Sequence, residues 1–363
     1  MISVKKISVV KKNKLTDVND DMKKLLNIMR KNNIENPEKY LPDSDYFNVS
    51  FELRTYTSFA NAVRRYLIEE LVVDCLDIDE TDIITTDEFL ITDVVKKNIN
   101  LIPINQDFDK KVLDKMNLCI DVFNNTNKHK YVMANDIILF NKQIDQQTTY
   151  KEKKSSINIK KLIPDNVPIL MLGPAQRLTI NNINIVSGMS KDDASKFSLL
   201  DSVSYKPIGY TPYNNFTKEG VRSSDINPNE FKISFTTTGN ISVKKVFEKM
   251  SDGMRERLNN IRQKLVKYDV NPENYYVDVG IKISTTDNIT TYKFIGEYIT
   301  ITYMIAHRCY LLDENIAFCS PSIDRYDNEI GVIKISHPTS TKLIIKSIDD
   351  CIKDINTLQK SFM

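Results

Sequence analysis

Residues 59–70 read FANAVRRYLIEE, and this stretch decides the fold of the chain more than any other. Its apolar side chains recur every three or four positions, which predicts an amphipathic helix over Phe59–Leu71. Thr57 and Ser58 precede this helix, and we expect their hydroxyls to cap its first turn. A helix with one apolar stripe has to bury that stripe against another element, so this region belongs to a packed core.

The segments around this helix alternate between strand and helix patterns. Before it, the pattern predicts a strand over Ile2–Val10, a helix over Asp17–Lys31 within an insertion at about 15–44, and a strand over Tyr46–Leu53. After it, strands with acidic edges are expected between 71 and 91, and a short helix over Thr92–Ile99. From about 105 to 204 the sequence changes to short strands with polar connections, which indicates a second, β-rich module.

A long helix beginning after Ser242 carries the strongest periodic signal. Its stripe consists of Val243, Phe247, Met250, Met254, Leu258, Ile261 and Leu265. Beyond residues 269–272 the same layout starts again on a smaller scale. We expect a strand over Tyr275–Ser284, a helix over Thr290–Ala306, strands near Ile316–Ser322 and Gly331–Ser336, and a final helix over Ser340–Phe362. The last helix should bury Ile345, Ile348, Ile352, Ile355 and Phe362. The sequence therefore predicts an α+β fold in which one unit occurs twice.

Composition limits the classes of function. The 363 residues include 50 basic and 48 acidic side chains, so a net charge of +2 gives no reason to expect a nucleic-acid coat or a membrane surface. The five cysteines are an odd number without a CxxC pair, which argues against a disulfide framework and a thiolate zinc site. No apolar run approaches the roughly 18 residues of a membrane span. We expect a soluble protein inside the cell.

The sequence offers no pattern for catalysis, so we expect no catalytic, cofactor-binding or metal-binding residues. The three histidines, His129, His307 and His337, are far apart in the sequence, and the glycines form no phosphate-binding loop. A cluster of four acidic residues could in principle bind a metal ion: Asp77, Asp79, Glu80 and Asp82. Acidic side chains on a strand edge are more often solvent-facing, and we expect that here.

Several stretches resemble the α family of RNA polymerase subunits. FANAVRRYLIEE is similar to the first helix of that family, and the Leu-Ile-Pro-Ile of Leu101–Ile104 follows as it does there. Ile169–Leu178, with the loop Lys191–Phe197, resembles the family's strand, Gly-Gln turn, strand and Lys-Glu-His-Ala loop. Phe231–Gly239 and the long helix resemble the return to the dimerisation domain.

The C-terminal part, from Tyr275 to Phe362, is similar to the small partner subunit of that family. The resemblance implies a fusion of the third-largest and eleventh subunits of the eukaryotic enzyme, or of the archaeal D-type and L-type subunits, as in some large cytoplasmic DNA viruses. It implies a D-type dimerisation domain over 1–104 and 205–269, a β-rich insert over 105–204, and an L-type dimerisation domain over 270–363. Each dimerisation unit is expected to be an antiparallel sheet packed with helices.

The resemblance also implies the function: a non-catalytic assembly platform of DNA-directed RNA polymerase, used in transcription, with the active site in partner subunits. The expected partners are the largest, second-largest and other polymerase subunits, with DNA and RNA bound only indirectly and no membrane. Four residues are expected at the partner interface: Asn61, Arg64, Arg65 and Glu69. The internal dimerisation helices are expected to use Phe247, Met250, Met254, Leu258, Ile261, Ile295, Ile299, Ile348, Ile352 and Ile355. The location would be the cytoplasm or virion for a virus-encoded chain, and otherwise the nucleus or cytosol.

Two departures from the family and two rival functions remain. Lys97–Asn100 stands where relatives have His-Arg-Leu-Gly, and Cys119 is the one cysteine of the insert, so no zinc or iron–sulfur site is inherited. A stand-alone nucleic-acid-binding protein would use the basic N-terminus, which contains Lys5, Lys6, Lys11, Lys12, Lys14, Lys23 and Lys24. A metal-dependent phosphotransferase would use the acidic strands. Both lack the surrounding side chains that they need.

Overall fold

The computed structural model describes residues 2–12, 27–28, 30–31, 46–108, 116–141, 162–163, 167–208, 229–237, 240–270, 275–324 and 330–363. It has 38% helix and 40% strand, so the expected α+β class is confirmed. Within these residues the strands form four antiparallel sheets, and no helix is long and apolar enough to cross a membrane. The helix expected at Asp17–Lys31 lies outside the described residues except at 27–28 and 30–31, which are helical.

The first sheet-and-helix body, called unit 1 below, contains segments from both ends of a long stretch of sequence. Its sheet has the order β1 (Ser3–Lys12), β2 (Tyr46–Arg54), β11 (Glu230–Thr237), β10 (Leu200–Pro207). Its helices are α2 (Thr57–Arg65), continued by the π-helical turn η2 (Tyr66–Glu70), and α7 (Val243–Val270). The Ser242 hydroxyl accepts a hydrogen bond from the Lys245 amide at 3.3 Å and caps α7, as the sequence predicted.

Unit 2 repeats this architecture in a continuous segment. Its sheet has the order β12 (Tyr275–Asp278), β13 (Ile281–Thr286), β14 (Ile289–Ile295), β16 (Ile330–Ser336), β15 (Phe318–Ile323). Its helices are α8 (Ile299–Leu312) and α9 (Ser340–Lys360). Apart from the short helical segments at 27–28 and 30–31, the described residues of each unit thus form one antiparallel sheet with two main helices, which explains why their sequence patterns share a layout without sharing residues.

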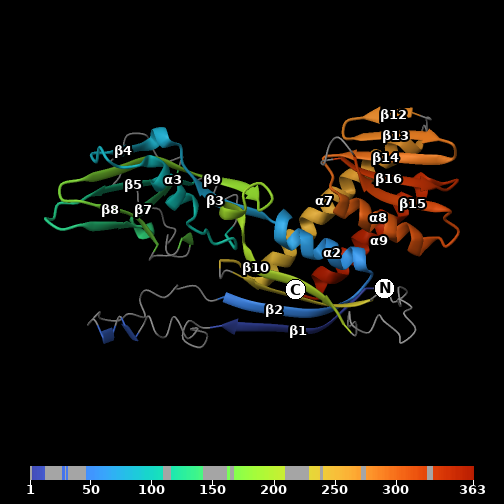
Figure 1. Cartoon of the computed structure of the whole chain (residues 1–363), viewed down its shortest axis with the longest axis horizontal. Coiled ribbons are helices and arrows are strands. Elements are labelled where there is room, and N and C mark those ends of the chain that lie inside the picture. Colours follow the sequence, from blue (N-terminus) through green and yellow to red (C-terminus); the bar gives the residue numbers. More distant parts are fainter. Residues whose placement is uncertain are drawn as a thin grey trace, which may run out of the picture.

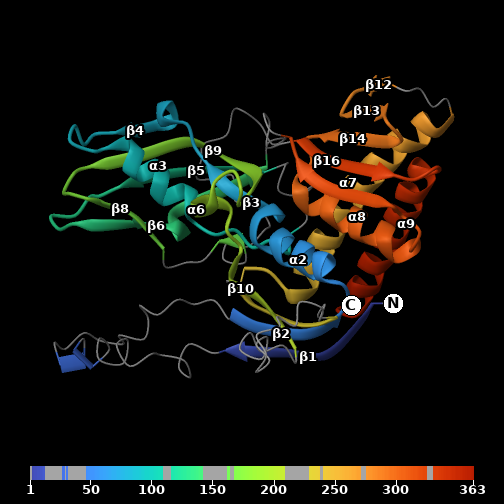
Figure 2. The ribbon, with the colours of Figure 1, turned by 45° about the vertical axis from the view of Figure 1, so that its right-hand side comes forward.

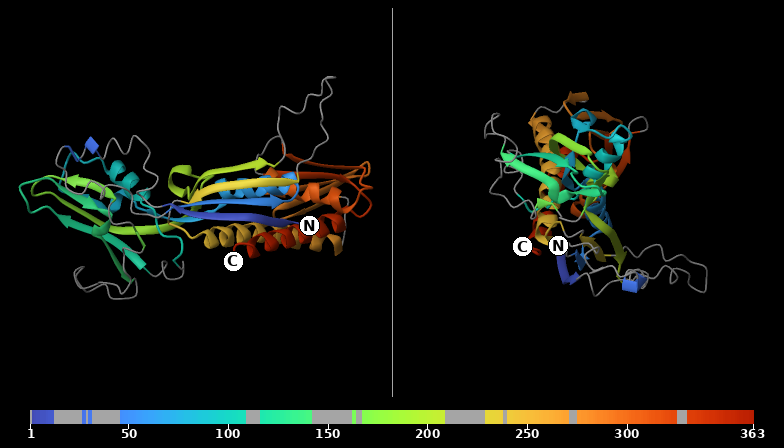
Figure 3. Two further views of the ribbon diagram at one scale, coloured as in Figure 1. Left: turned by 90° about the horizontal axis from the view of Figure 1, so that it is seen from below. Right: turned by 90° about the vertical axis from the view of Figure 1, so that its left-hand side faces the viewer.

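The four helices fill the space between the two sheets (Figure 1). One hydrophobic cluster includes buried residues from both sheets and all four helices. Within it α7 and α9 lie side by side (Figure 3), and the Phe247 ring stacks on Phe362 with centroids 3.6 Å apart. The expectation that the two long helices cover each other's apolar stripes is confirmed. Burial of this size drives folding, because each fully buried large side chain contributes roughly 1.5–3 kcal/mol.

The insert forms a separate layer beside unit 1 (Figure 2). Its main sheet has the order β3 (Val72–Asp77), β9 (Arg177–Met189), β5 (Met116–Phe123), β7 (Ile137–Asn141), and β4 (Ile83–Thr85) also pairs with β9. A ribbon of β6 (Lys130–Met133) and β8 (Pro168–Leu172) completes it. The short helical segments are η3 (Glu80–Asp82), α3 (Thr92–Asn100), η4 (Ala134–Asp136) and α6 (Ala194–Phe197). These elements surround a second hydrophobic cluster.

The two clusters do not divide at the boundaries expected from the sequence. Val95, Ile99 and Ile102, assigned to the first domain, pack in the insert's cluster, because α3 covers β3 and β8. At the other end, β10 crosses residues 204 and 205, since the whole strand pairs with β11. In the structure α3 therefore packs with the insert, whereas residues 200–204 belong to the sheet of unit 1.

Three local expectations were wrong. The segment 290–295 is a strand and not the start of a helix, because β13 and β16 pair with it on both sides; the helix α8 begins only at Ile299. The strand expected over Tyr275–Ser284 is interrupted at Gly280, whose φ of +82° makes a turn that glycine adopts readily. The first turn of α2 has no side-chain cap.

Candidate partner interface

Helix α2 carries most of the residues expected at the partner interface. Its apolar stripe is buried, and consists of Phe59, Ala60, Ala62 and Val63. Asn61, Arg64 and Arg65 are only partly buried and lie on the other side of the helix. The sequence spacing alone produces this separation, since positions three and four apart share a helix face.

Arg64 is fixed by two neighbours. Its Nε and Nη2 atoms both donate to Asn61 Oδ1 at 3.1 Å, and its guanidinium lies over the Tyr205 ring, 5.6 Å from the centroid. A cation–π contact of this kind contributes roughly 0.5–1 kcal/mol at exposed sites. Arg64 is therefore held in one orientation against β10 and is not a freely solvated cation.

Arg65 and Glu69 form the second pair on this face. Arg65 Nη2 lies 3.0 Å from Glu69 Oε2, with the side chains 29% and 38% exposed. The Glu69 carbonyl also accepts a hydrogen bond from the Lys191 amide at 3.0 Å, which attaches the loop before α6 to this helix. The four expected interface residues thus come together as two pairs, Asn61–Arg64 and Arg65–Glu69. Such an ordered, half-exposed face suits a polar contact with a carboxylate-bearing partner.

The π-helical turn at Tyr66–Glu70 separates two acidic neighbours. Glu69 stays on the surface, whereas Glu70 is 3% exposed. Because a π turn adds a residue to the helical repeat, it rotates the residues that follow it about the axis. Glu70 consequently points into the contact between units 1 and 2.

Arg257 of α7 lies between Glu70 and Glu297. Its Nη1 atom contacts Glu70 Oε2, and its Nε and Nη2 atoms lie 2.9 and 2.7 Å from Glu297 Oε2. Burial raises the pKa of the Glu70 carboxyl, and the shared Arg257 offsets this only in part. Burial alone would lower the pKa of Arg257, but the two carboxylates outweigh it and raise that pKa. No pattern in the sequence predicted this cluster, because its members belong to three distant segments.

Tyr66 packs against α7 at a glycine. A Cβ atom at position 253 would lie 1.8 Å from the Tyr66 hydroxyl oxygen, so the contact requires Gly253. Burial raises the pKa of this hydroxyl, which keeps it neutral. Gly253 lies between Met250 and Met254 of the buried stripe. A glycine at such a position in the sequence could have indicated that another element packs closely against α7 there.

Helix α2 also contacts unit 2 directly. The Ser58 hydroxyl and His307 Nδ1 of α8 are 3.0 Å apart, and the Tyr56 hydroxyl lies 3.5 Å from Cys351 Sγ of α9. Burial lowers the pKa of His307. Ser58 lies inside α2, whose N-cap position is Tyr56, and its hydroxyl joins the two units.

The residues expected on the internal helices fall into two groups. Most are buried in the shared cluster: Phe247, Met250, Met254, Leu258, Ile261, Ile348 and Ile355. Ile352 and Ile345 pack partly buried against it, and Ile299 begins α8 half-buried. Ile295 was assigned to a helix wrongly, because it ends β14 and is 40% exposed.

Two of the acidic residues and one lysine of the basic N-terminus form ion pairs in the structure. Asp77 lies 2.8 Å from Lys196 Nζ and Glu80 lies 3.6 Å from Lys96 Nζ. Among the described residues, no group of three or more His, Cys, Asp or Glu side chains is placed to hold a metal ion. In β1, Lys6 pairs with Glu52 at 2.9 Å, and residues 13–24 lie outside the described ranges.

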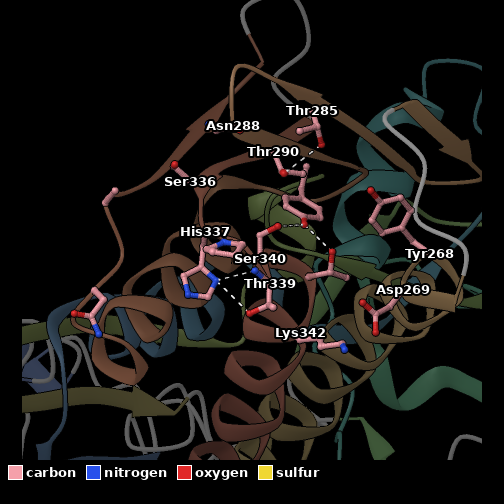
Figure 4. Close-up of a pocket in the computed structure, with 15 residues that line it drawn as sticks. Tyr268, Asp269, Thr285, Asn288, Thr290, Ser336, His337, Thr339, Ser340 and Lys342 are labelled. Atoms are coloured by element: carbon pink, nitrogen blue, oxygen red, sulfur yellow. Dashed lines mark hydrogen bonds between the residues drawn. The ribbon is translucent and has the colours of Figure 1, made fainter.

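A cavity of about 830 Å³ opens beside the first turn of α9 (Figure 4). His337 and Thr339 line it, and His337 also contacts Asp313, a combination that the sequence did not suggest. His337 Nε2 lies 3.0 Å from Asp313 Oδ2, and Nδ1 lies 3.4 Å from the Thr339 hydroxyl. Nδ1 already accepts a hydrogen bond from the Thr339 amide at 3.2 Å. Its lone pair is therefore occupied, and the arrangement orders the loop before α9 instead of activating a hydroxyl.

Comparison with known proteins adds no relative to this picture. No family model matches the sequence, and neither does any curated protein. The functional conclusion therefore rests on the residues and geometry described above.

Proposed function

We propose that this chain is a non-catalytic assembly platform of a multisubunit DNA-directed RNA polymerase, in which two dimerisation units are fused. Its partners would be the largest, second-largest and other polymerase subunits, and it would meet DNA and RNA only through the complex. It would act in the cytoplasm or virion if a virus encodes it, and otherwise in the nucleus or cytosol.

The observation that carries the proposal is the single core shared by units 1 and 2. Two antiparallel sheets enclose α2, α7, α8 and α9, and buried residues of all six elements form one cluster. This is the arrangement expected of a dimer of two related subunits, here within one polypeptide. The motif resemblance of residues 59–70 and 101–104 points to the same class of protein.

The mechanism that we infer is mechanical. The shared core holds α2 rigid, and α2 presents Arg64 and Arg65 already oriented by Asn61 and Glu69. A partner carboxylate would then find guanidinium groups whose side-chain entropy is already restricted, which lowers the cost of binding. Fusion makes the pairing of the units intramolecular, with an effective concentration on the order of mM for a short linker, and fixes their ratio at one to one.

Affinity purification of the tagged chain from cells that produce it naturally tests the proposal. Two large polypeptides, one with the magnesium-binding carboxylates of a polymerase, should co-purify in equal amounts together with RNA synthesis activity. Purification of the chain without any large partner would contradict the proposal. Steep, salt-sensitive DNA binding by the isolated chain would instead favour the nucleic-acid-binding alternative.

A further inference from the structure

Three arginines of α7 reach from unit 1 to polar groups of unit 2. Arg255 Nη1 donates to Asn356 Oδ1 at 2.6 Å and to Gln359 Oε1 at 2.9 Å, both on α9. Arg255 also contacts Asp252 of its own helix. The contact between α7 and α9 is therefore polar along its border as well as apolar at its centre.

Both ion pairs that the described residues form between the units have the same polarity. Arg262 Nε of α7 donates to Asp349 Oδ1 of α9 at 2.6 Å, and Arg257 of α7 contacts Glu297 before α8. Unit 1 supplies the cation each time, and unit 2 supplies the carboxylate. The first pair is 39% exposed on each side, and the second is largely buried.

Pairing of like units would bring like charges together. Within unit 1, Asp252 pairs with Arg255 and Glu70 pairs with Arg257, so among the described residues Arg262 is the arginine of this border whose carboxylate partner comes from unit 2 alone. Two copies of unit 1 joined through their α7 stripes would leave Arg262 without that carboxylate. Two copies of unit 2 joined through α9 would bring together the helix faces that carry Asp349, Asp350 and Asp354. Arg308 of α8 lies 3.3 Å from Asp350 and 3.6 Å from Asp354, so it compensates these two carboxylates within unit 2, but it makes no described ion pair with Asp349.

We propose that this polarity is a pairing code, in which the basic border of α7 and the acidic border of α9 select the union of unit 1 with unit 2. The apolar stripes favour helix contact in general but do not distinguish one long helix from another. Interfaces often achieve such selection by charges that repel the wrong partner. The code directs each new chain toward its intramolecular partner while other copies are folding nearby. The inference depends only on the contact between the units, so it stands apart from the proposed role in polymerase.

Arg262 and Asp349 allow a direct test, because among the described residues their side chains form hydrogen bonds and an ion pair with each other and with no other side chain. A protease site replacing residues 271–274 lets the folded chain be cut between α7 and β12. A second cut chain carries Arg262→Asp with Asp349→Arg, which exchanges the charges without removing them. The two cut chains are mixed and allowed to exchange fragments, and native mass spectrometry counts the four possible pairs. Matched pairs should exceed mismatched pairs about fivefold at low salt and less at high salt, because these charges are partly exposed.

A double-mutant cycle in the uncut chain provides the second measurement. Arg262→Asp and Asp349→Arg should each lower the urea midpoint of unfolding, and the two together should restore it. Equal amounts of the four pairs, or a double variant no more stable than the single ones, would overturn the proposal. If the cut chains do not exchange fragments, the cycle alone decides. The neutral pair Arg262→Gln with Asp349→Asn is the control, and it should fold without any preference among pairs.

Discussion

The contact between α7 and α9 differs in kind from the outer face of α2. The first has an apolar interior in which Met254 and Leu258 are fully buried, and near the start of α7 the Phe247 ring stacks on Phe362, just beyond the end of α9. The second is polar and half-exposed, and its arginines are already paired within α2 and η2. The α7–α9 contact consists mainly of buried apolar side chains, whereas the outer face of α2 consists of charged side chains held in fixed orientations.

This difference separates stability from assembly. Burial of large side chains dominates folding free energy, whereas exposed ion pairs contribute roughly 0–1 kcal/mol. Changes to the buried apolar side chains of the α7–α9 contact should therefore lower the free energy of unfolding. Changes on the α2 face should leave it folded and affect its partners.

The largest effect on stability is expected for Phe247→Ala. The Phe247 ring is 1% exposed and touches both Phe51 and Phe362. Removing it should lower the free energy of unfolding by roughly 3–5 kcal/mol, as for other buried aromatic residues. Urea denaturation measures this. The control Phe123→Ala removes a ring that is 52% exposed and should change stability by less than about 0.5 kcal/mol. Equal effects of the two substitutions would show that the shared core is not the source of stability.

The second effect is on assembly. Arg64→Ala with Arg65→Ala should keep the folded circular-dichroism spectrum but weaken docking to the large subunits by roughly 2 kcal/mol or more for each arginine. Arg177→Ala is the matched control, because Arg177 also pairs with a carboxylate, Asp121, at 2.8 Å but lies in the insert. Wild-type yield of assembled polymerase from the double variant would remove α2 from the interface.

A third, smaller effect on stability is expected where η2 packs closely against α7. Gly253→Ala places a methyl group where the Tyr66 hydroxyl lies, and overpacking of this kind typically costs roughly 1–3 kcal/mol. Tyr66→Phe removes the hydroxyl oxygen, so the double variant should recover part of the loss in thermal unfolding. If Gly253→Ala alone is neutral, the two helices are farther apart than described.

The smallest effect is a pH dependence at Glu70. Because burial raises the pKa of this carboxyl in the folded state, the folded chain binds the proton more tightly than the unfolded chain does. The contribution of Glu70 to stability is therefore greatest at low pH and is lost as the pH rises above the ordinary value of 4.5. The free energy of unfolding of the wild type relative to Glu70→Gln should fall across that window. A difference that rises with pH would mean that Arg257 outweighs burial.

The sequence predicted the elements whose periodicity is long. The apolar stripe of α7 contains seven residues spread along most of the helix. The predicted helix, its N-terminal cap and its buried face all match the structure. The segment 290–306 misled the prediction because a short apolar run fits both a strand and a helix. Pairing with β13 and β16 decides it, and those partners come from outside the segment.

The candidate site was predictable only on its outer side. Asn61, Arg64, Arg65 and Glu69 stand on one helix, so their spacing places them together. The Glu70–Arg257–Glu297 cluster was missed because Glu70 and Arg257 are 187 positions apart in the sequence. Their meeting depends on the packing of α7 between two sheets, which a pattern along one segment does not contain.

The most direct test of the fused platform is to divide the chain in two. Residues 1–270 and 271–363 are co-expressed, and their association is measured by size-exclusion chromatography with light scattering. Since the two units share one core, the fragments should co-elute as a one-to-one complex, and 271–363 alone should aggregate or self-associate because its helices would be bare. Two soluble monomers that do not bind each other would contradict the account.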